Sequence, residues 1–98
     1  MFSHVVILWA DPAKPDAAGE IVAAAEKYLK SIPGILNFHV GKMVRSHRDV
    51  VDQSYQVALN IQFPNKQEQD EYQVHPQHLE FVKQCKPLLA KLVVYDFE

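Results

Sequence analysis

The chain has a single cysteine, Cys85, so no disulfide can form within it. A small domain without such cross-links suits a reducing compartment. No apolar run is long enough to span a bilayer, and the run at residues 5–9 is too short for the core of a signal peptide and follows no basic cluster. We therefore expect a soluble, cytoplasmic protein with no membrane contact.

The chain also has little net charge and few glycines. The 10 Lys and Arg residues are nearly balanced by 12 Asp and Glu residues, and the two signs are interspersed along the chain. A nucleic-acid partner is not expected, because such surfaces need a basic patch. With only three glycines, the chain has no Gly-rich phosphate loop or nucleotide fingerprint, and it has no Ser-His-Asp order. We expect no bound cofactor.

What is abundant is hydrophobic residues, which make up 48% of the 98 residues and suffice for one buried core. No linker, repeat or low-complexity segment divides the chain, so we expect a single domain over residues 1–98. Segments rich in β-branched and aromatic residues predict strands at residues 2–9, 35–44, 54–63 and 92–97. Apolar residues at three- and four-residue spacing predict a helix over residues 15–32, ended by Pro33 and Gly34.

A second helical region is predicted between the last two strands. Asn65 is a suitable N-cap and Glu68 lies in the capping-box position, so a helix is expected from there to about residue 73. Pro76 holds His75 in an extended conformation and suits the first turn of a new helix. The apolar side of that helix is expected to consist of Leu79, Phe81, Val82 and Cys85.

This β-α-β-β-α-β order is that of the ferredoxin-like fold, an α+β protomer with a four-stranded antiparallel sheet and both helices on one face. Two helices cover only one face of such a sheet. The first strand is nevertheless apolar on both sides, with Val6 and Leu8 on one and Val5, Ile7 and Trp9 on the other. Exposed, the second set would form an apolar patch larger than monomers usually carry. We therefore expect a homodimer, a dimeric α/β barrel made by sheet-to-sheet packing.

The other strands modify this expected interface. Phe38 or Met43 is expected to add to it from the second strand. The third strand instead carries a polar set, which implies a partly hydrated barrel interior or a position near its rim: Gln56, Asn60 and Gln62. The charged loop at residues 45–54 is expected to be mobile.

One stretch is specific enough to suggest a family. Residues 72–82 read Tyr-x-x-His-Pro-x-His-x-x-Phe-Val, and weaker similarities lie at residues 4–8, 32–35, 55–59 and 93–97. Together they resemble the stress-responsive dimeric A/B-barrel (Dabb) family over the whole chain. The resemblance implies a ferredoxin-like protomer that forms a homodimer. The family includes stress-induced stable proteins with no known reaction and a plant polyketide cyclase that closes a linear tetraketide into an aromatic acid.

The resemblance also implies site residues. In the cyclase a tyrosine and a histidine of this motif act together, the histidine as base, and they match Tyr72 and His78. A strand histidine of the cyclase matches His4. A further histidine of the cyclase falls where this chain has Val57, which puts that particular cyclization in doubt. Lining roles are expected for Val57, Leu59, Phe81 and His75.

The chemistry of these side chains independently suits them to acid–base catalysis. A neutral imidazole such as that of His78 can accept a proton at physiological pH, and a tyrosine hydroxyl such as that of Tyr72 can stabilise a developing enolate. An aldol-type closure needs only these two functions. If His4 shares the helix side with Val6 and Leu8, it faces the same interior.

Simpler interpretations stand beside these. His75 can be a helix N-cap, His78 and His4 can be buried histidines bonded to the protein, and Tyr72 can be a core aromatic. His75 and His78 have a spacing that a metal site can use, but no further ligand pair lies nearby, so no metal is expected. Cys85 is expected to be a small core residue.

Two functions from different classes remain. The first is a cofactor-free enzyme or binding protein for a small, partly apolar, carbonyl-bearing molecule, with Tyr72 as donor, His78 as base and His4 as a positioning group. The second is a non-catalytic, stress-associated structural or interaction dimer in which the same residues hold the helix break in place. An open cavity beside His78 separates the two, because the first function requires it and the second predicts that the space is filled.

Overall fold

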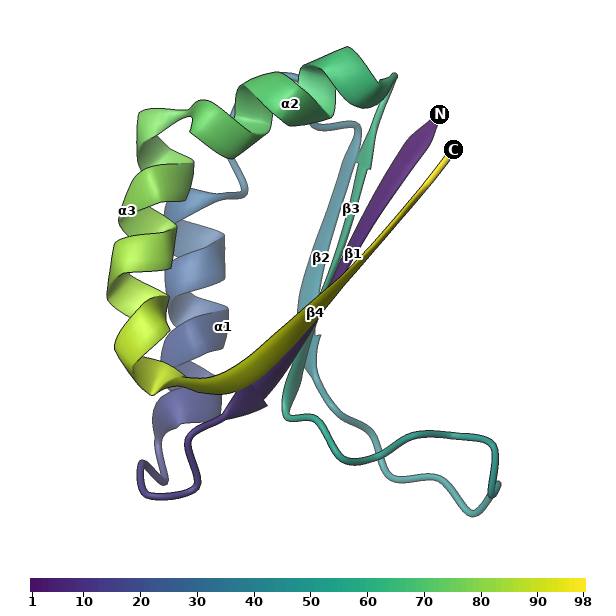
Figure 1. The fold of residues 1–98 in the computed structure, drawn as a ribbon, viewed down its shortest axis with the longest axis vertical. Helices are drawn as coiled ribbons and strands as arrows, with labels where there is room; N and C mark the ends of the chain where they lie inside the picture. The colour runs from purple at the N-terminus through teal and green to yellow at the C-terminus, as the bar shows by residue number, and fades with distance from the viewer.

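The computed structural model describes all residues from 1 to 98 and has one sheet covered on one face by helices (Figure 1). The strands are β1 (Phe2–Ala10), β2 (Asn37–Lys42), β3 (Val57–Phe63) and β4 (Leu89–Phe97). The helices are α1 (Ala17–Tyr28), α2 (Lys66–Val74) and α3 (Pro76–Cys85), followed by the 3-10 turn η1 (Lys86–Leu88). The expected element order and fold class are confirmed, and no helix has both the length and the apolarity that a membrane crossing needs.

The sheet has the strand order β2-β3-β1-β4, and every pair is antiparallel. The register places Leu8 beside Val57 and Val6 beside Leu59. Successive side chains of a strand point to opposite faces of the sheet, so these four lie on the same face. That face is the one covered by the helices, where they pack with residues of α1. They belong to a buried core of 14 residues: Phe2, Val6, Leu8, Ile21, Ala25, Leu29, Ile32, Val57, Leu59, Ile61, Phe63, Tyr72, Phe81 and Cys85.

The pairing of β1 with β4 brings the two ends of the chain together and leaves β4 at the edge of the sheet. In Figure 1 the chain ends lie side by side, because β1 and β4 run antiparallel along most of their length. β4 is an edge strand, and its helix-facing Leu92 and Val94 remain half exposed. The segment between β2 and β3 is free of helix and strand, as expected, and extends away from the sheet (Figure 1).

The open face of the sheet is divided into two halves. One half, from β1 and β4, is apolar: Val5, Ile7, Trp9, Val93, Tyr95 and Phe97. The other half, from β3 and β2, is polar and includes Asn60, Gln62 and Asn37. Phe38 was expected on this face, but it pairs with Ile61 and packs against the core. The Phe38 alternative was wrong because the phase of β2 is set by its register with β3, whereas the alternative of Met43, just beyond the end of β2, stays a prediction.

Several boundaries of helices and strands also differ from the predicted ones. α1 ends at Tyr28, although the buried Leu29 and Ile32 continue its apolar stripe through a turn. β2 and β3 are shorter than predicted, at six and seven residues. β4 begins three residues early, at Leu89, because a bulge after Trp9 lets Ala10 pair with it.

The turn between α1 and β2 depends on a glycine. Gly34 has a φ of 94°, and a Cβ there would lie 2.5 Å from Glu68 Oε2 on α2. Residues with a Cβ rarely adopt that backbone conformation, and a Cβ here would also displace the flexible end of the Glu68 side chain. The Pro33-Gly34 signal therefore marks the end of the helical stripe, and Gly34 permits the turn that follows it.

The break between α2 and α3 forms as the sequence predicts. The Asn65 side chain accepts a hydrogen bond from the Glu68 backbone N–H at 3.0 Å. His75 has an extended backbone, and its Nδ1 accepts a hydrogen bond from the Gln77 N–H at 3.1 Å, so His75 is the N-cap of α3. The buried side of α3 consists of His78, Phe81 and Cys85. Leu79, predicted to be on that side, is exposed instead, and Val82 is half exposed.

The cap at Asn65 gives a modest stability prediction. We expect Asn65→Ala to lower the free energy of unfolding by about 1 kcal/mol, because the first turn of α2 loses its side-chain acceptor. Urea denaturation followed by circular dichroism measures this. Gln67→Ala is the matched control, since Gln67 is exposed in the same turn and caps nothing. An equal loss in both variants would show that the cap contributes little.

Candidate functional site

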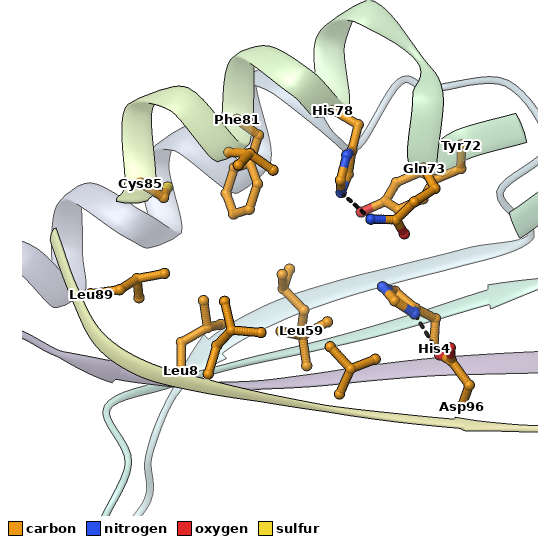
Figure 2. Close-up of a pocket in the computed structure, with 14 residues that line it drawn as sticks. His4, Leu8, Leu59, Tyr72, Gln73, His78, Phe81, Cys85, Leu89 and Asp96 are labelled. Carbon is orange, nitrogen blue, oxygen red and sulfur yellow. Dashed lines mark hydrogen bonds and ion pairs between the residues drawn. The ribbon is translucent and has the colours of Figure 1, made fainter. Parts of the chain in front are cut away.

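A cavity of about 210 Å³ lies between the sheet and the helices α2 and α3 (Figure 2). Its wall is apolar toward one end, where Phe81 and Cys85 of α3 face Leu8 and Leu89. At the other end the polar groups gather: His4, Tyr72, Gln73, His78 and Asp96. The half-exposed Val82, Leu92 and Val94 also line it, so the cavity reaches the surface along the edge of β4.

His4 enters this polar end from β1 and is held by a carboxylate. Its Nδ1 lies 2.6 Å from Asp96 Oδ1 on the neighbouring β4, where the two residues are direct strand partners. Only a protonated Nδ1 can donate to a carboxylate, so Nε2 is left as the free ring nitrogen of a neutral His4. His4 is buried, whereas the Asp96 side chain is 43% exposed.

Tyr72 and His78 lie against each other at the break between the helices. Their ring centroids are 4.8 Å apart, and the His4 and Tyr72 centroids are 5.8 Å apart. Figure 2 shows the His78 ring pointing from α3 toward the sheet, with the Tyr72 ring beside it. The structure thus brings together the three residues that the sequence analysis expected to act together.

The surroundings set the protonation of these groups. Burial raises the pKa of the Tyr72 hydroxyl well above its usual value, so it stays a hydrogen-bond donor. Burial, and then the proximity of His4, lower the pKa of His78 below its usual value of 6.5, although the backbone of Gln73 opposes this. His78 is therefore a neutral imidazole at physiological pH. Neutral imidazole is the form that accepts a proton.

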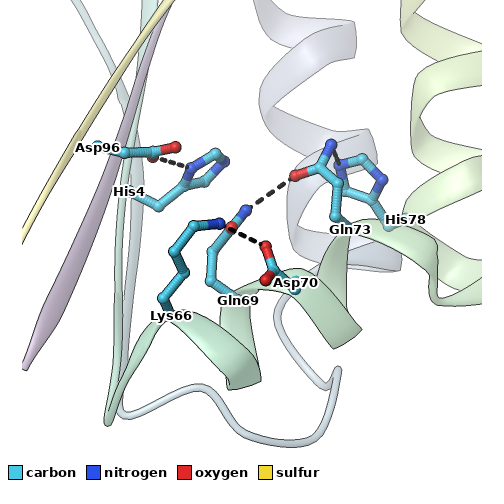
Figure 3. A network of polar contacts seen from close by, with 7 residues as sticks. All are labelled: His4, Lys66, Gln69, Asp70, Gln73, His78 and Asp96. Atoms are coloured by element: carbon cyan, nitrogen blue, oxygen red, sulfur yellow. Dashed lines mark hydrogen bonds and ion pairs between the residues drawn. The ribbon is translucent and has the colours of Figure 1, made fainter.

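Two glutamines of α2 form a chain of polar contacts that reaches the His78 ring (Figure 3). The buried Gln69 donates from Nε2 to Gln73 Oε1 at 2.9 Å, one helical turn away. That bond leaves the Gln73 amide nitrogen directed at His78 Nε2, at a distance of 3.5 Å. His78 Nδ1 is buried with no hydrogen-bond partner. The long Gln73 contact leaves His78 Nε2 weakly engaged.

Other predicted site residues have different positions. Leu59 and Phe81 line the cavity. Val57 is fully buried in the core and does not line it. His75 does not line it either, and its Nδ1 accepts the capping hydrogen bond of α3.

Three polar residues of this region were not predicted from the sequence: Gln69, Gln73 and Asp96. The signal for Asp96 was present, since it alternates with Leu92 and Val94 and so shares their face of the last strand. Gln73 lies one residue after Tyr72, inside the recognised motif. Cys85, expected to be a core residue, is buried at the apolar end, and burial raises the pKa of its thiol to about 11. It is therefore an unreactive thiol at neutral pH.

Known proteins are similar to this chain in both sequence and fold. The profile of the stress responsive A/B barrel domain family matches residues 2–98. The chain belongs to this family. A stress-response A/B barrel domain-containing protein of Arabidopsis thaliana is 29% identical over 97 residues, which is 98% of this chain and 84% of that protein. The family membership and the fold expected from the sequence are both confirmed.

Solved structures show the same A/B barrel fold. A dimeric ferredoxin-like protein of unknown function from Thermobifida fusca superposes with a TM-score of 0.81 at 22% identity, covering 98% of this chain and 88% of that one. A hydroxynitrile lyase from Passiflora edulis superposes with a TM-score of 0.80 at 18% identity, covering 98% and 90%. At these identities the likeness concerns the fold alone.

Proposed function

We propose that this A/B barrel protein binds a small, partly apolar, carbonyl-bearing molecule and transforms it by acid–base chemistry without a cofactor. The observation that carries the proposal is the open cavity beside His78, where a neutral imidazole and a protonated tyrosine lie together. A purely structural dimer would have no use for such a space. The alternative of a non-catalytic dimer is therefore the less favoured.

The proposed roles follow from the protonation states. His78 Nε2 accepts a proton from the carbon next to the carbonyl, and the Tyr72 O–H donates a hydrogen bond to the carbonyl oxygen as negative charge develops there. His4, fixed by Asp96, positions the ligand at the same end. The enolate then either recovers the proton from His78 or attacks a second carbonyl. Because Val57 replaces the third histidine and lies outside the cavity, we propose a reaction other than the plant cyclization.

We also propose a cytoplasmic homodimer. The support is the apolar half of the open sheet face, formed by β1 and β4, and the relative from T. fusca that is described as dimeric. Burial of each aliphatic side chain there contributes about 1.5–3 kcal/mol. The cytoplasmic location is supported by the lone, buried Cys85.

Deuterium exchange tests the catalytic proposal. The protein should accelerate the exchange of the methyl protons of acetophenone with D₂O, followed by ¹H NMR. The ketone should also shift the NMR signals of Leu92 and Val94, which line the cavity. Free imidazole at the same concentration is the control, because it supplies the base without the site. Binding with no acceleration beyond that control would refute the catalytic role and leave a binding protein.

A further inference from the structure

The polar end of the cavity contains no cationic side chain other than a histidine. Its charged or chargeable groups are His4, His78 and Asp96, and neither Lys nor Arg lines the cavity. Lys66, on α2 near this end (Figure 3), is bound to Asp70 at 2.7 Å and is largely exposed. A ligand inside the cavity would therefore meet no free positive charge.

The one ionic group at this end is negative. Asp96 is paired with His4, so the pair carries a charge of minus one when His4 is neutral and zero when His4 is protonated. Neither state is positive. The neutral His78 adds nothing to this balance, and a second carboxylate placed here would lose its hydration without gaining a counter-ion.

The hydrogen-bonding groups nevertheless suit an oxygen ligand. Gln73 lines the cavity, and its carbonyl oxygen is already engaged by Gln69 at 2.9 Å. Its N–H₂ group has two hydrogens, so one can be directed at His78 Nε2, 3.5 Å away, while the other remains to donate to a ligand. Tyr72 supplies an O–H donor beside it. Two neutral donors at one end, with apolar walls around Phe81 and Leu89 at the other, match a molecule with one acceptor oxygen and an apolar body.

We propose that the cavity selects neutral aldehydes and ketones of about one-ring size and rejects carboxylates of the same shape. This inference rests on the proposed function, since it concerns the ligand of the same site. The size follows from the cavity volume of about 210 Å³, compared with about 150 Å³ for an apolar cavity that accommodates benzene. Asp96 is the residue that sets the selection, and Gln73 and Tyr72 recognise the oxygen.

Three ligands of nearly the same shape test the selection. Acetophenone, benzamide and benzoate are compared by NMR titration of the protein at pH 7.5. The two neutral ligands should bind at least about 10-fold more tightly than benzoate, which is the effect of about 1.4 kcal/mol of unfavourable charge placement. Benzamide controls for hydrophobicity, because it is polar but uncharged. Equal or tighter binding of benzoate overturns the inference while leaving the proposed site standing.

A variant isolates the role of Asp96. Asp96→Asn should raise the affinity for benzoate relative to that for acetophenone by at least about 3-fold, because only the charged ligand is repelled by the carboxylate, whereas a looser His4 affects both ligands alike. Glu98→Gln is the matched control, since Glu98 is exposed and does not line the cavity. If Asp96→Asn leaves the ratio of the benzoate and acetophenone affinities unchanged, the selection by Asp96 is wrong. If none of the three ligands binds the wild-type protein, both the inference and the proposed function fail.

Discussion

Replacement of His78 by glutamine is expected to slow the exchange of ketone α-protons by about 10²- to 10⁴-fold, the usual contribution of a general base. The ketone should still bind, because the apolar walls and the Tyr72 and Gln73 donors remain. Glutamine has a similar reach but no basic nitrogen. ¹H NMR measures both quantities on the same samples. His47→Gln is the control, since His47 lies exposed in the segment between β2 and β3.

The pH dependence of the same rate provides an independent check. His78 acts as a base only when neutral, and burial beside His4 places its pKa below 6.5. The rate should therefore be constant above that pH and fall as the pH drops through the lowered pKa. A rate that halves at a pH above 6.5 would point to a different base. An unchanged rate of proton exchange in the His78→Gln variant would contradict the assignment of His78 as the general base.

Replacement of Val5 by aspartate is expected to abolish dimerisation at micromolar concentration. Val5 lies at the centre of the open face, between Asn60 of β3 and Tyr95 of β4. In a sheet-to-sheet dimer each copy would bury an unpaired carboxylate, which weakens association by at least about 100-fold, or about 3 kcal/mol. Size-exclusion chromatography with light scattering measures the mass of the particle.

The control for this variant is Val74→Asp, which adds the same charge at an exposed valine on α2. It should remain dimeric. If the Val5 variant is insoluble, urea unfolding of refolded protein distinguishes a lost interface from a lost fold, because Val5 is only partly buried within one protomer. A soluble Val5→Asp dimer would mean that the protomers associate through another surface.

The elements of the fold were readable from the sequence because their signals are local. The alternation in β3 and the Asn65 cap depend on neighbours within a few residues, and both appear as predicted. What failed depended on partners distant in the chain. Phe38 lies on the helix side because of its register with Ile61, which no local pattern specifies. Leu79 is exposed because α3 packs His78, Phe81 and Cys85 against the rest of the domain, and this choice of face depends on the sheet and α1.

The residues of the candidate site also separate into those with a local sequence signal and those that depend on distant partners. Tyr72 and His78 belong to one short motif, so the sequence placed them together before the fold was known. Asp96 had an alternation signal, but its pairing with His4 depends on the β1–β4 register. The role of Gln73 depends on the orientation of its amide, which a separate residue, Gln69, determines. Val57 shows the opposite case, where correspondence with a relative suggested a lining residue that the packing buries elsewhere.

The pairing of His4 with Asp96 joins residues 92 positions apart in the chain. Closing so large a loop carries a high entropic cost and is favourable only when the whole sheet forms, so the polar end of the cavity has no partly folded precursor. Any ligand held there binds the native state and not the unfolded chain. Occupancy should therefore raise the melting temperature of the entire domain. Thermal-shift screening then becomes a direct search for the natural ligand.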